Sequence, residues 1–198
     1  MKNIKPKHIL LASLAAALIL GIYYVVFPGK FLPGEFTDAR IKGATVAQRI
    51  VELSRDTLSQ LNQVSQYDQQ RRTSEALIVI SNAVLANRES QAEAIRLSSQ
   101  LNAMAENLSR IKPDSARQIA TEAVTAEVAL ASRLIYYNAY LAELFETLKV
   151  KLQRPKAYYL DGQVNDLINK INDEAQAINE LNKKFNSAMA ELDGIFGR

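Results

Sequence analysis

The chain contains no cysteine, and its only histidine is His8. Without cysteine no disulfide can form, and the cysteine and histidine sets that usually hold zinc are missing. A single histidine also excludes a Ser-His-Asp triad and the paired Glu-x-x-His motifs of di-iron helical bundles. The seven glycines are scattered, so the sequence has no loop of the kind that cradles phosphate groups. We therefore expect a protein that is not an enzyme and that uses no metal or other cofactor.

Four long segments contain almost no glycine or proline, and none alternates polar and apolar residues as a half-buried strand does. Apolar residues instead recur at steps of three and four. This spacing predicts helices over about 37–66, 70–111 and 114–153, and a fourth helix after Asp161-Gly162. Because the connections are short, we predict an all-α fold, an antiparallel up-down four-helix bundle of long, coiled-coil-like helices. A three-helix rod with a looser first helix is the alternative.

The apolar stripes predict which positions face the core. The stripe of the third helix includes Val124, Val128 and Leu134, and the fourth helix has the most regular stripe, interrupted by the polar Asn182. In the second helix, polar residues 87–93 separate two apolar sets that do not share one seven-residue register. The second helix therefore either continues through this segment or bends there.

Residues 9–27 carry no charge and follow a basic tail, residues 1–8, that contains three lysines. As a helix this run spans roughly 28 Å, close to the hydrocarbon thickness of a bilayer. We predict that it forms a transmembrane anchor in the lipid bilayer. The anchor positions are Ile9, Leu10, Leu14, Leu18, Leu20, Ile22, Tyr23, Tyr24 and Phe27. A cleavable signal peptide, cut near Ala15 and Ala17, is the alternative.

The lysines of the tail lie just before the apolar run, whereas Lys30, Arg40 and Lys42 are spread beyond it. Basic residues next to a span tend to remain in the cytoplasm. We therefore predict a single-pass protein of the cell envelope with a cytoplasmic tail and an extracytoplasmic body. In this arrangement residues 28–36 form a linker, and residues 37–198 form one helical domain. The opposite orientation, with the body in the cytoplasm, is the alternative.

The chain has 24 lysines and arginines against 21 aspartates and glutamates, a net charge of +3. The three lysines of the tail account for this excess, so the charges of the body balance. A nucleic-acid-binding domain would carry a basic excess of its own. Nucleic acid is therefore not a favoured partner.

An up-down bundle brings its first and third connections together at the end far from the membrane. Basic and aromatic residues flank both connections in this chain. The predicted partner-binding tip consists of Tyr67, Arg71, Arg72, Lys149, Lys151, Arg154, Lys156, Tyr158 and Tyr159. Such a surface suits an acidic protein, an anionic polymer or a lipid surface. The helix dipole favours cations at the end of the third helix, but it disfavours Arg71 and Arg72 at the start of the second.

These features predict a membrane-anchored structural or protein-interaction module that binds a protein partner or associates with itself. The alternative is a ligand-sensing bundle that works through a separate signalling partner. Its small-molecule site would involve Tyr136, Tyr137 and Tyr140, although Tyr137 also continues the core stripe. A third hypothesis is a helical protein whose apolar segment inserts into a membrane only on assembly.

Overall fold

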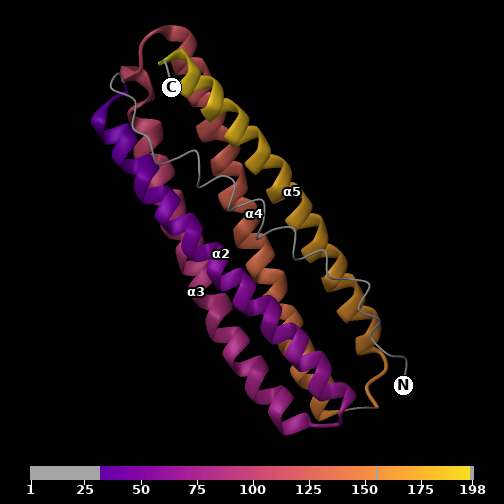
Figure 1. Cartoon of the computed structure of the whole chain (residues 1–198). Helices are drawn as coiled ribbons and strands as arrows, with labels where there is room; N and C mark the ends of the chain where they lie inside the picture. Colours follow the sequence, from indigo (N-terminus) through magenta and orange to yellow (C-terminus); the bar gives the residue numbers. More distant parts are fainter. Residues whose placement is uncertain (1–31, 155, 197–198) are drawn as a thin grey trace.

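The computed structural model describes residues 32–154 and 156–196. Their secondary structure contains helices and no strand. The elements are α2 (Gly34–Gln69), α3 (Thr73–Glu106), the short 3-10 helix η2 (Leu108–Arg110), α4 (Asp114–Gln153) and α5 (Leu160–Ile195). Figure 1 shows that the four long helices run alternately up and down. The all-α class and the helical bundle are thus confirmed for the described part of the chain.

Close backbone packing joins each long helix to the next one along the chain. The helix α2 packs against α3, α3 against α4, and α4 against α5, whereas α2 and α5 do not pack closely along their lengths. The bundle therefore consists of two antiparallel hairpins, α2–α3 and α4–α5, that meet mainly between α3 and α4 (Figure 1). Since α2 packs along α3 as extensively as α5 packs along α4, the first helix is not the looser element that the three-helix alternative required.

The helix α2 begins at Gly34, inside the segment 28–36 that was expected to be a linker. Pro33 precedes it with a φ of −53°, and its carbonyl accepts a hydrogen bond from the Thr37 N–H at 3.1 Å. Proline favours the start of a helix because its φ is already close to the helical value and it has no N–H to satisfy. The predicted tail, the anchor 9–27 and the first residues of the linker lie outside the described residues. Within the described residues, no helix combines the length and the apolar character of a membrane span.

The helix α3 runs without a break through the polar segment that separates its two apolar sets. Asn87 and Ser90 are each 3% exposed, and Glu93 is 7% exposed, so this polar side faces inward. The Asn87 Nδ2 donates a hydrogen bond of 2.8 Å to the carbonyl of Asn138 on α4. A buried amide that finds such a partner is compatible with a continuous helix. The alternative of a break in the helix near Asn87 is therefore wrong.

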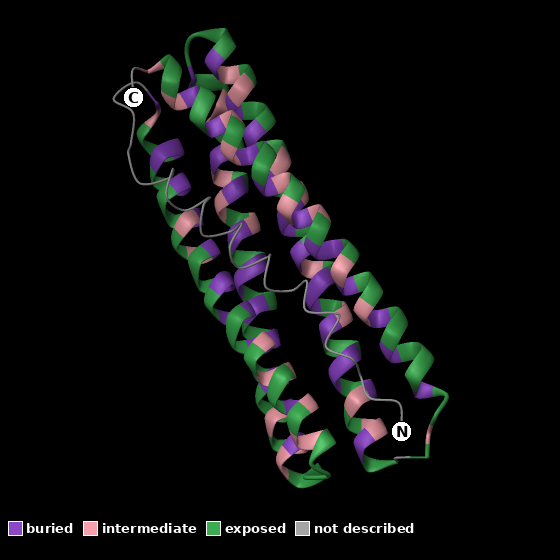
Figure 2. Cartoon of the chain, turned by 45° about the vertical axis from the view of Figure 1, so that its right-hand side comes forward, coloured by how far each residue is buried: buried purple, intermediate pink, exposed green. Residues whose placement is uncertain are grey.

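The core follows the inward faces of all four long helices, where Figure 2 shows the buried residues. Phe36, Leu101, Phe145 and Ile178, one from each helix, are at most 2% exposed. Burying an apolar side chain of this size stabilises the fold by roughly 1.5–3 kcal/mol. The polar interruption of the α5 stripe, Asn182, is buried as well, at 4% exposure.

The core stripe predicted for α4 is wrong at one position. Val128 is 46% exposed, whereas the preceding residue, Glu127, is only 7% exposed. The buried positions around it are Val124, Ala131 and Leu134, so steps of three and four lead to position 127. Val128 was expected in the core because its side chain is apolar. The helical spacing instead places Glu127 at the buried position.

The bundle has two ends, which we call the base and the tip. The base is the end where the described chain begins at Leu32 and ends at Phe196, and both residues pack against the core there. The tip is the opposite end, which carries the turns between α2 and α3 and between α4 and α5 (Figure 1).

A buried ion pair joins α2 to α5 at the base. The Arg40 guanidinium donates two hydrogen bonds of 2.9 Å to the Asp193 carboxylate. The Arg40 side chain is 1% exposed and that of Asp193 is 15% exposed. Arg110 makes a second link at this end, at 3.0 Å from the Glu35 carboxylate. The base is therefore closed by polar contacts between residues far apart in the sequence.

Candidate functional site at the tip of the bundle

The turn between α2 and α3 holds Arg71 in a left-handed conformation. The Arg71 N–H donates to the carbonyl of Asp68 at 3.0 Å, and the Arg72 N–H donates to the carbonyl of Tyr67 at 2.8 Å. This pair of bonds is the Schellman motif, which ends a helix with one left-handed residue. That residue is Arg71, with a φ of 60°. Glycine is usual at this position, because a side chain there costs roughly 1–2 kcal/mol.

The connection between α4 and α5 is a tight turn that directs two tyrosines into solvent. The Ala157 N–H donates to the carbonyl of Arg154 at 2.9 Å, and the Leu160 N–H donates to the carbonyl of Ala157 at 3.0 Å. Leu160, the first residue of α5, is buried, whereas Tyr158 and Tyr159 are 70% and 73% exposed. A tyrosine ring that is buried contributes to the core. These two adjacent rings are exposed instead, so they are available for contact with a partner.

Within the α2–α3 hairpin, Arg72 and Tyr67 are engaged with neighbouring side chains. The Arg72 Nε donates a hydrogen bond of 2.9 Å to a carboxylate oxygen of Glu75. The Arg72 guanidinium also lies 4.5 Å from the centre of the Tyr67 ring, within the range of a cation–π contact. The hydrogen bond from Arg72 lowers the pKa of the Glu75 carboxyl. These two predicted tip residues therefore support the turn itself.

Within the α4–α5 hairpin, Lys149 and Lys151 are engaged in the same way. The Lys149 ammonium lies 3.7 Å from the Glu146 carboxylate one turn before it. The Lys151 ammonium lies 2.5 Å from the Asp161 carboxylate and so links α4 to α5. Both lysines therefore have an internal partner.

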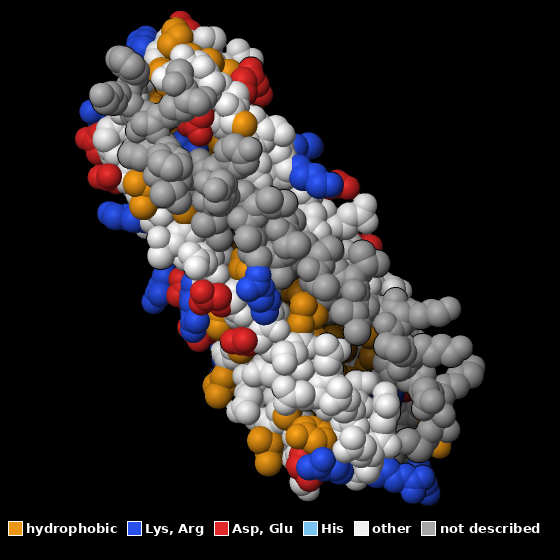
Figure 3. Space-filling model, viewed as in Figure 1, with side chains coloured by type: hydrophobic (Ala, Val, Ile, Leu, Met, Phe, Trp, Pro, Cys, Tyr) orange, Lys and Arg blue, Asp and Glu red, His pale blue; other side chains and the backbone are white. Residues whose placement is uncertain are grey.

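The remaining five predicted residues are exposed at the tip, and none has a side-chain partner within the described part of the chain. They are Arg71, Arg154, Lys156, Tyr158 and Tyr159. They come from both turns, which lie at the same end of the bundle, and Figure 3 shows lysine and arginine side chains at its lower end. The structure thus divides the nine predicted residues into four that stabilise the turns and five that are available to a partner.

The tip is more basic than the base. The tip segments 67–75 and 146–161 contain six basic and four acidic residues, a net charge of +2. The base segments 32–42, 104–117 and 190–196 contain five basic and six acidic residues, a net charge of −1. The charges of the body balance overall, but they are distributed unequally between its ends.

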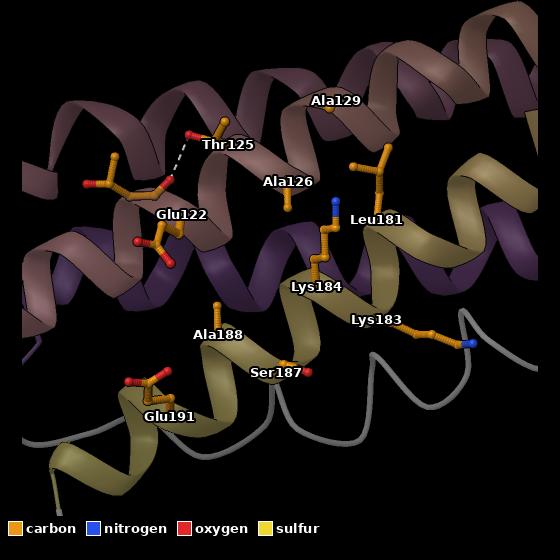
Figure 4. Close-up of a pocket in the computed structure, with 11 residues that line it drawn as sticks. Glu122, Thr125, Ala126, Ala129, Leu181, Lys183, Lys184, Ser187, Ala188 and Glu191 are labelled. Atoms are coloured by element: carbon orange, nitrogen blue, oxygen red, sulfur yellow. Dashed lines mark hydrogen bonds between the residues drawn. The ribbon is translucent and has the colours of Figure 1, made fainter.

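A groove of about 670 Å³ lies between α4 and α5 in the base half of the bundle. Four of its eleven lining residues are apolar, namely Ala126, Ala129, Leu181 and Ala188, and the other seven are polar or charged. Figure 4 shows that Lys184 points toward α4 across the groove and that Glu122 faces it from α4. The groove can therefore hold a ligand with an apolar body.

The three tyrosines predicted to form a small-molecule site do not line this groove. Tyr136 is 56% exposed, and Tyr137 is 2% exposed. Burial raises the pKa of the Tyr137 hydroxyl. The ring centre of Tyr140 lies 5.4 Å from the Lys170 ammonium of α5. Tyr137 thus belongs to the core, Tyr140 is partly buried against it, and Tyr136 is exposed, so the three do not form one site.

Four buried charged residues, Arg40, Glu93, Glu127 and Glu174, were not identified from the sequence, and two of them differ most from what was expected. One is Arg40, which was counted only as a charge near the membrane. The other is Glu127, whose carboxyl pKa is raised by burial to about 7. Its Oε2 has no hydrogen-bond partner in the described residues. Among those residues, no cluster of histidine, aspartate and glutamate side chains could hold a metal ion.

Comparisons with known proteins assign no family to the chain. No family model, no curated protein and no solved structure matches it.

Proposed function

We propose that this protein is a non-enzymatic, membrane-anchored helical bundle that presents its tip to a partner on the extracytoplasmic side. The observation that carries the proposal is the separation of the two ends. The described chain enters and leaves the bundle at the base, and the five basic and aromatic residues that have no side-chain partner among the described residues lie at the tip.

The apolar run of the sequence supports attachment at the base. Residues 9–27 are uncharged and end five residues before Leu32. A chain that leaves a bilayer at Phe27 can therefore reach the base within a short distance, because an extended residue spans at most about 3.6 Å. The helix α4 has 40 residues and is roughly 60 Å long, so the tip would stand far from that bilayer.

Cysteine labelling tests both the anchor and the orientation, since the natural chain has no cysteine. One variant is Ser74→Cys, at an exposed position of the tip, and its matched control is Asn3→Cys in the tail. Intact cells are treated with a membrane-impermeant maleimide. We expect Ser74→Cys to be labelled in intact cells, Asn3→Cys to be labelled only after lysis, and both chains to remain at full mass in the membrane fraction.

Two results would contradict the proposal. Labelling of Ser74→Cys only after lysis would place the bundle in the cytoplasm. A shortened product in the soluble fraction would identify residues 1–27 as a cleaved signal peptide.

A photo-crosslinking residue at Tyr158 then tests the interaction itself. We expect adducts from this position and none from Val128, which is exposed on the side of the bundle.

The groove between α4 and α5 favours the alternative of ligand sensing. Its volume is that of a small-molecule site, and its lining offers apolar contacts from four residues beside polar and charged groups from seven. If the protein senses such a ligand, a compound that binds there should raise the midpoint of thermal unfolding. The substitution Ala126→Leu fills the groove and should abolish that shift, whereas Tyr136→Ala should leave it unchanged.

A further inference from the structure

We propose that the tip docks on an anionic lipid surface, so that the bundle spans the space between two membranes. This inference rests on the proposed function, because it assigns a chemical class to the partner of the tip. The residues that carry it are three cations without a side-chain partner in the described part of the chain, Arg71, Arg154 and Lys156, and the two exposed tyrosines beside them.

The combination of residues is the one that suits a membrane interface. Tyrosine is enriched at the level of the lipid headgroups, because its ring is apolar and its hydroxyl is polar. Lysine and arginine near an anionic leaflet gain electrostatic energy from the negative surface potential. Tyr158 and Tyr159 follow directly after Lys156, so one short turn presents both kinds of contact together.

The conformation of Arg71 points to a requirement for its charge. The residue occupies the left-handed position of a helix-ending motif, where glycine would be the more stable choice. Its side chain is exposed and makes no hydrogen bond, ion pair or ring contact within the described residues that would compensate for this conformation. Strained residues that no internal contact explains are concentrated at functional sites.

The shape of the site favours a flat surface over a flexible anionic polymer. Proteins that bind such polymers track the backbone with a positively charged groove. Here the three cations lie in two separate turns at the blunt end of a rod (Figure 3), and none of them lines the groove between α4 and α5. The excess charge of the tip, +2, is also small, so aromatic contacts must contribute to binding.

Vesicle binding by the full chain tests the inference. The chain is inserted into nanodiscs of neutral phosphatidylcholine, and insertion is verified by resistance to alkaline extraction. The discs are then mixed with vesicles of phosphatidylcholine, with or without phosphatidylglycerol, and co-sedimentation is measured. We expect discs that carry the chain to sediment with the anionic vesicles only.

Substitutions at the tip should weaken binding to the anionic vesicles. The loss of binding free energy should be proportional to the number of cations removed, so the losses of affinity multiply. We expect Arg154→Gln with Lys156→Gln to lower the affinity roughly 25-fold, at about fivefold per cation. Arg71→Gly should lower it about fivefold, and this variant suits the turn, so its loss of binding cannot come from misfolding. The matched control is Lys183→Gln with Lys184→Gln, which removes the same charge from the side of the bundle and should change the affinity by less than about twofold.

Three results would overturn the inference. The first is an equal loss of binding in the Lys183 and Lys184 control, which would mean that net charge alone attracts the vesicles. The second is retention on heparin beads with no vesicle binding, which would assign the tip to an anionic polymer. The third is no binding to either.

Failure of the proposed anchor gives a different result. Discs that do not take up the chain would contradict the membrane anchor of the proposed function. Binding of the tip to anionic lipid would then be tested without nanodiscs. The chain alone would then be floated with the same two kinds of vesicle, and the same variants would be compared.

Discussion

The base and the tip contain similar numbers of cations but hold them differently. At the base, four of the five cations lie within ion-pair distance of a carboxylate, and Lys42 alone has no such partner in the described residues; the four are Arg40, Arg110, Lys112 and Arg117. At the tip, three of the six cations have no such partner in the described residues, and two tyrosines beside them are exposed. The comparison indicates that one end of the bundle is built for stability and the other for contact.

The links between the two hairpins show the same difference. Arg40 joins them to Asp193 at the base, and Asn87 joins α3 to α4 near the middle. In the described residues no hydrogen bond or ion pair joins the two turns of the tip, so the hairpins are held there by apolar packing. Regions with fewer such links open locally at a lower free energy. The tip should therefore adapt to a partner more easily than the base.

The largest effect is expected from breaking the ion pair that closes the base. The substitution Asp193→Asn removes the carboxylate that receives two hydrogen bonds from Arg40. Loss of one member of a buried pair leaves the other charge poorly compensated, so the free energy of unfolding should fall by about 3 kcal/mol. Urea unfolding of the full chain in a mild detergent, followed by circular dichroism, measures the change.

The matched control for this experiment is Asp161→Asn at the tip. Asp161 pairs with Lys151, but half of its side chain is exposed, at 52%. Exposed ion pairs are worth at most about 1 kcal/mol, so this variant should be nearly as stable as the natural chain. Equal losses in the two variants would refute the view that the ends differ in their contribution to stability.

The second prediction concerns the buried carboxyl of Glu127, which lowers the free energy of unfolding when it is ionised. Burial raises the Glu127 pKa from 4.5 to about 7. Below pH 4.5 the carboxyl is protonated in both the folded and the unfolded chain and has no effect on stability. As the pH rises to 7, only the unfolded chain loses the proton, so the folded state becomes less stable by about 3 kcal/mol. Glu127→Gln should therefore stabilise the protein at pH 8 and leave it unchanged at pH 4.

Unfolding in urea at several pH values measures this effect. The control is Glu122→Gln, since Glu122 lies on the same helix but is exposed. We expect a change of less than about 0.5 kcal/mol for this control at every pH. A Glu127→Gln variant that is no more stable at pH 8 than the natural chain would show that the carboxylate is compensated in the folded state.

Much of the fold could be predicted because apolar periodicity determines which helix faces are buried. The stripes located all four helices, and Pro33 and Pro113 explain why two of them start where they do. The stripes could not show that the Asn87 Nδ2 finds a carbonyl on another helix, so the sequence left open whether the second helix continues through this polar segment. They also could not show that a glutamate, Glu127, occupies a core position, because charge normally indicates an exposed residue.

The candidate site was predictable in its location but not in its detail. Chain topology alone brings both turns to the same end, so the nine tip residues could be named from the sequence. Which of them are free depends on side-chain partners such as Glu75 for Arg72 and Asp161 for Lys151. The conformation of Arg71 had no sequence signal, because a left-handed arginine looks like any other arginine in a turn.

The smallest expected effect on the free energy of unfolding comes from substituting Arg71. The sign of that change shows whether Arg71 stabilises the fold, as the cations of the base do, or not. Glycine removes the steric cost of the left-handed conformation but gains freedom in the unfolded chain, so Arg71→Gly should stabilise the bundle by at most about 1 kcal/mol. The neighbouring substitution Gln70→Gly is the control, because Gln70 has an ordinary φ of −82° and should lose about 0.5–1 kcal/mol. Urea unfolding of both variants gives the comparison. If Arg71→Gly loses stability as Gln70→Gly does, then Arg71 supports the fold, and its charge is not held at the tip for a partner.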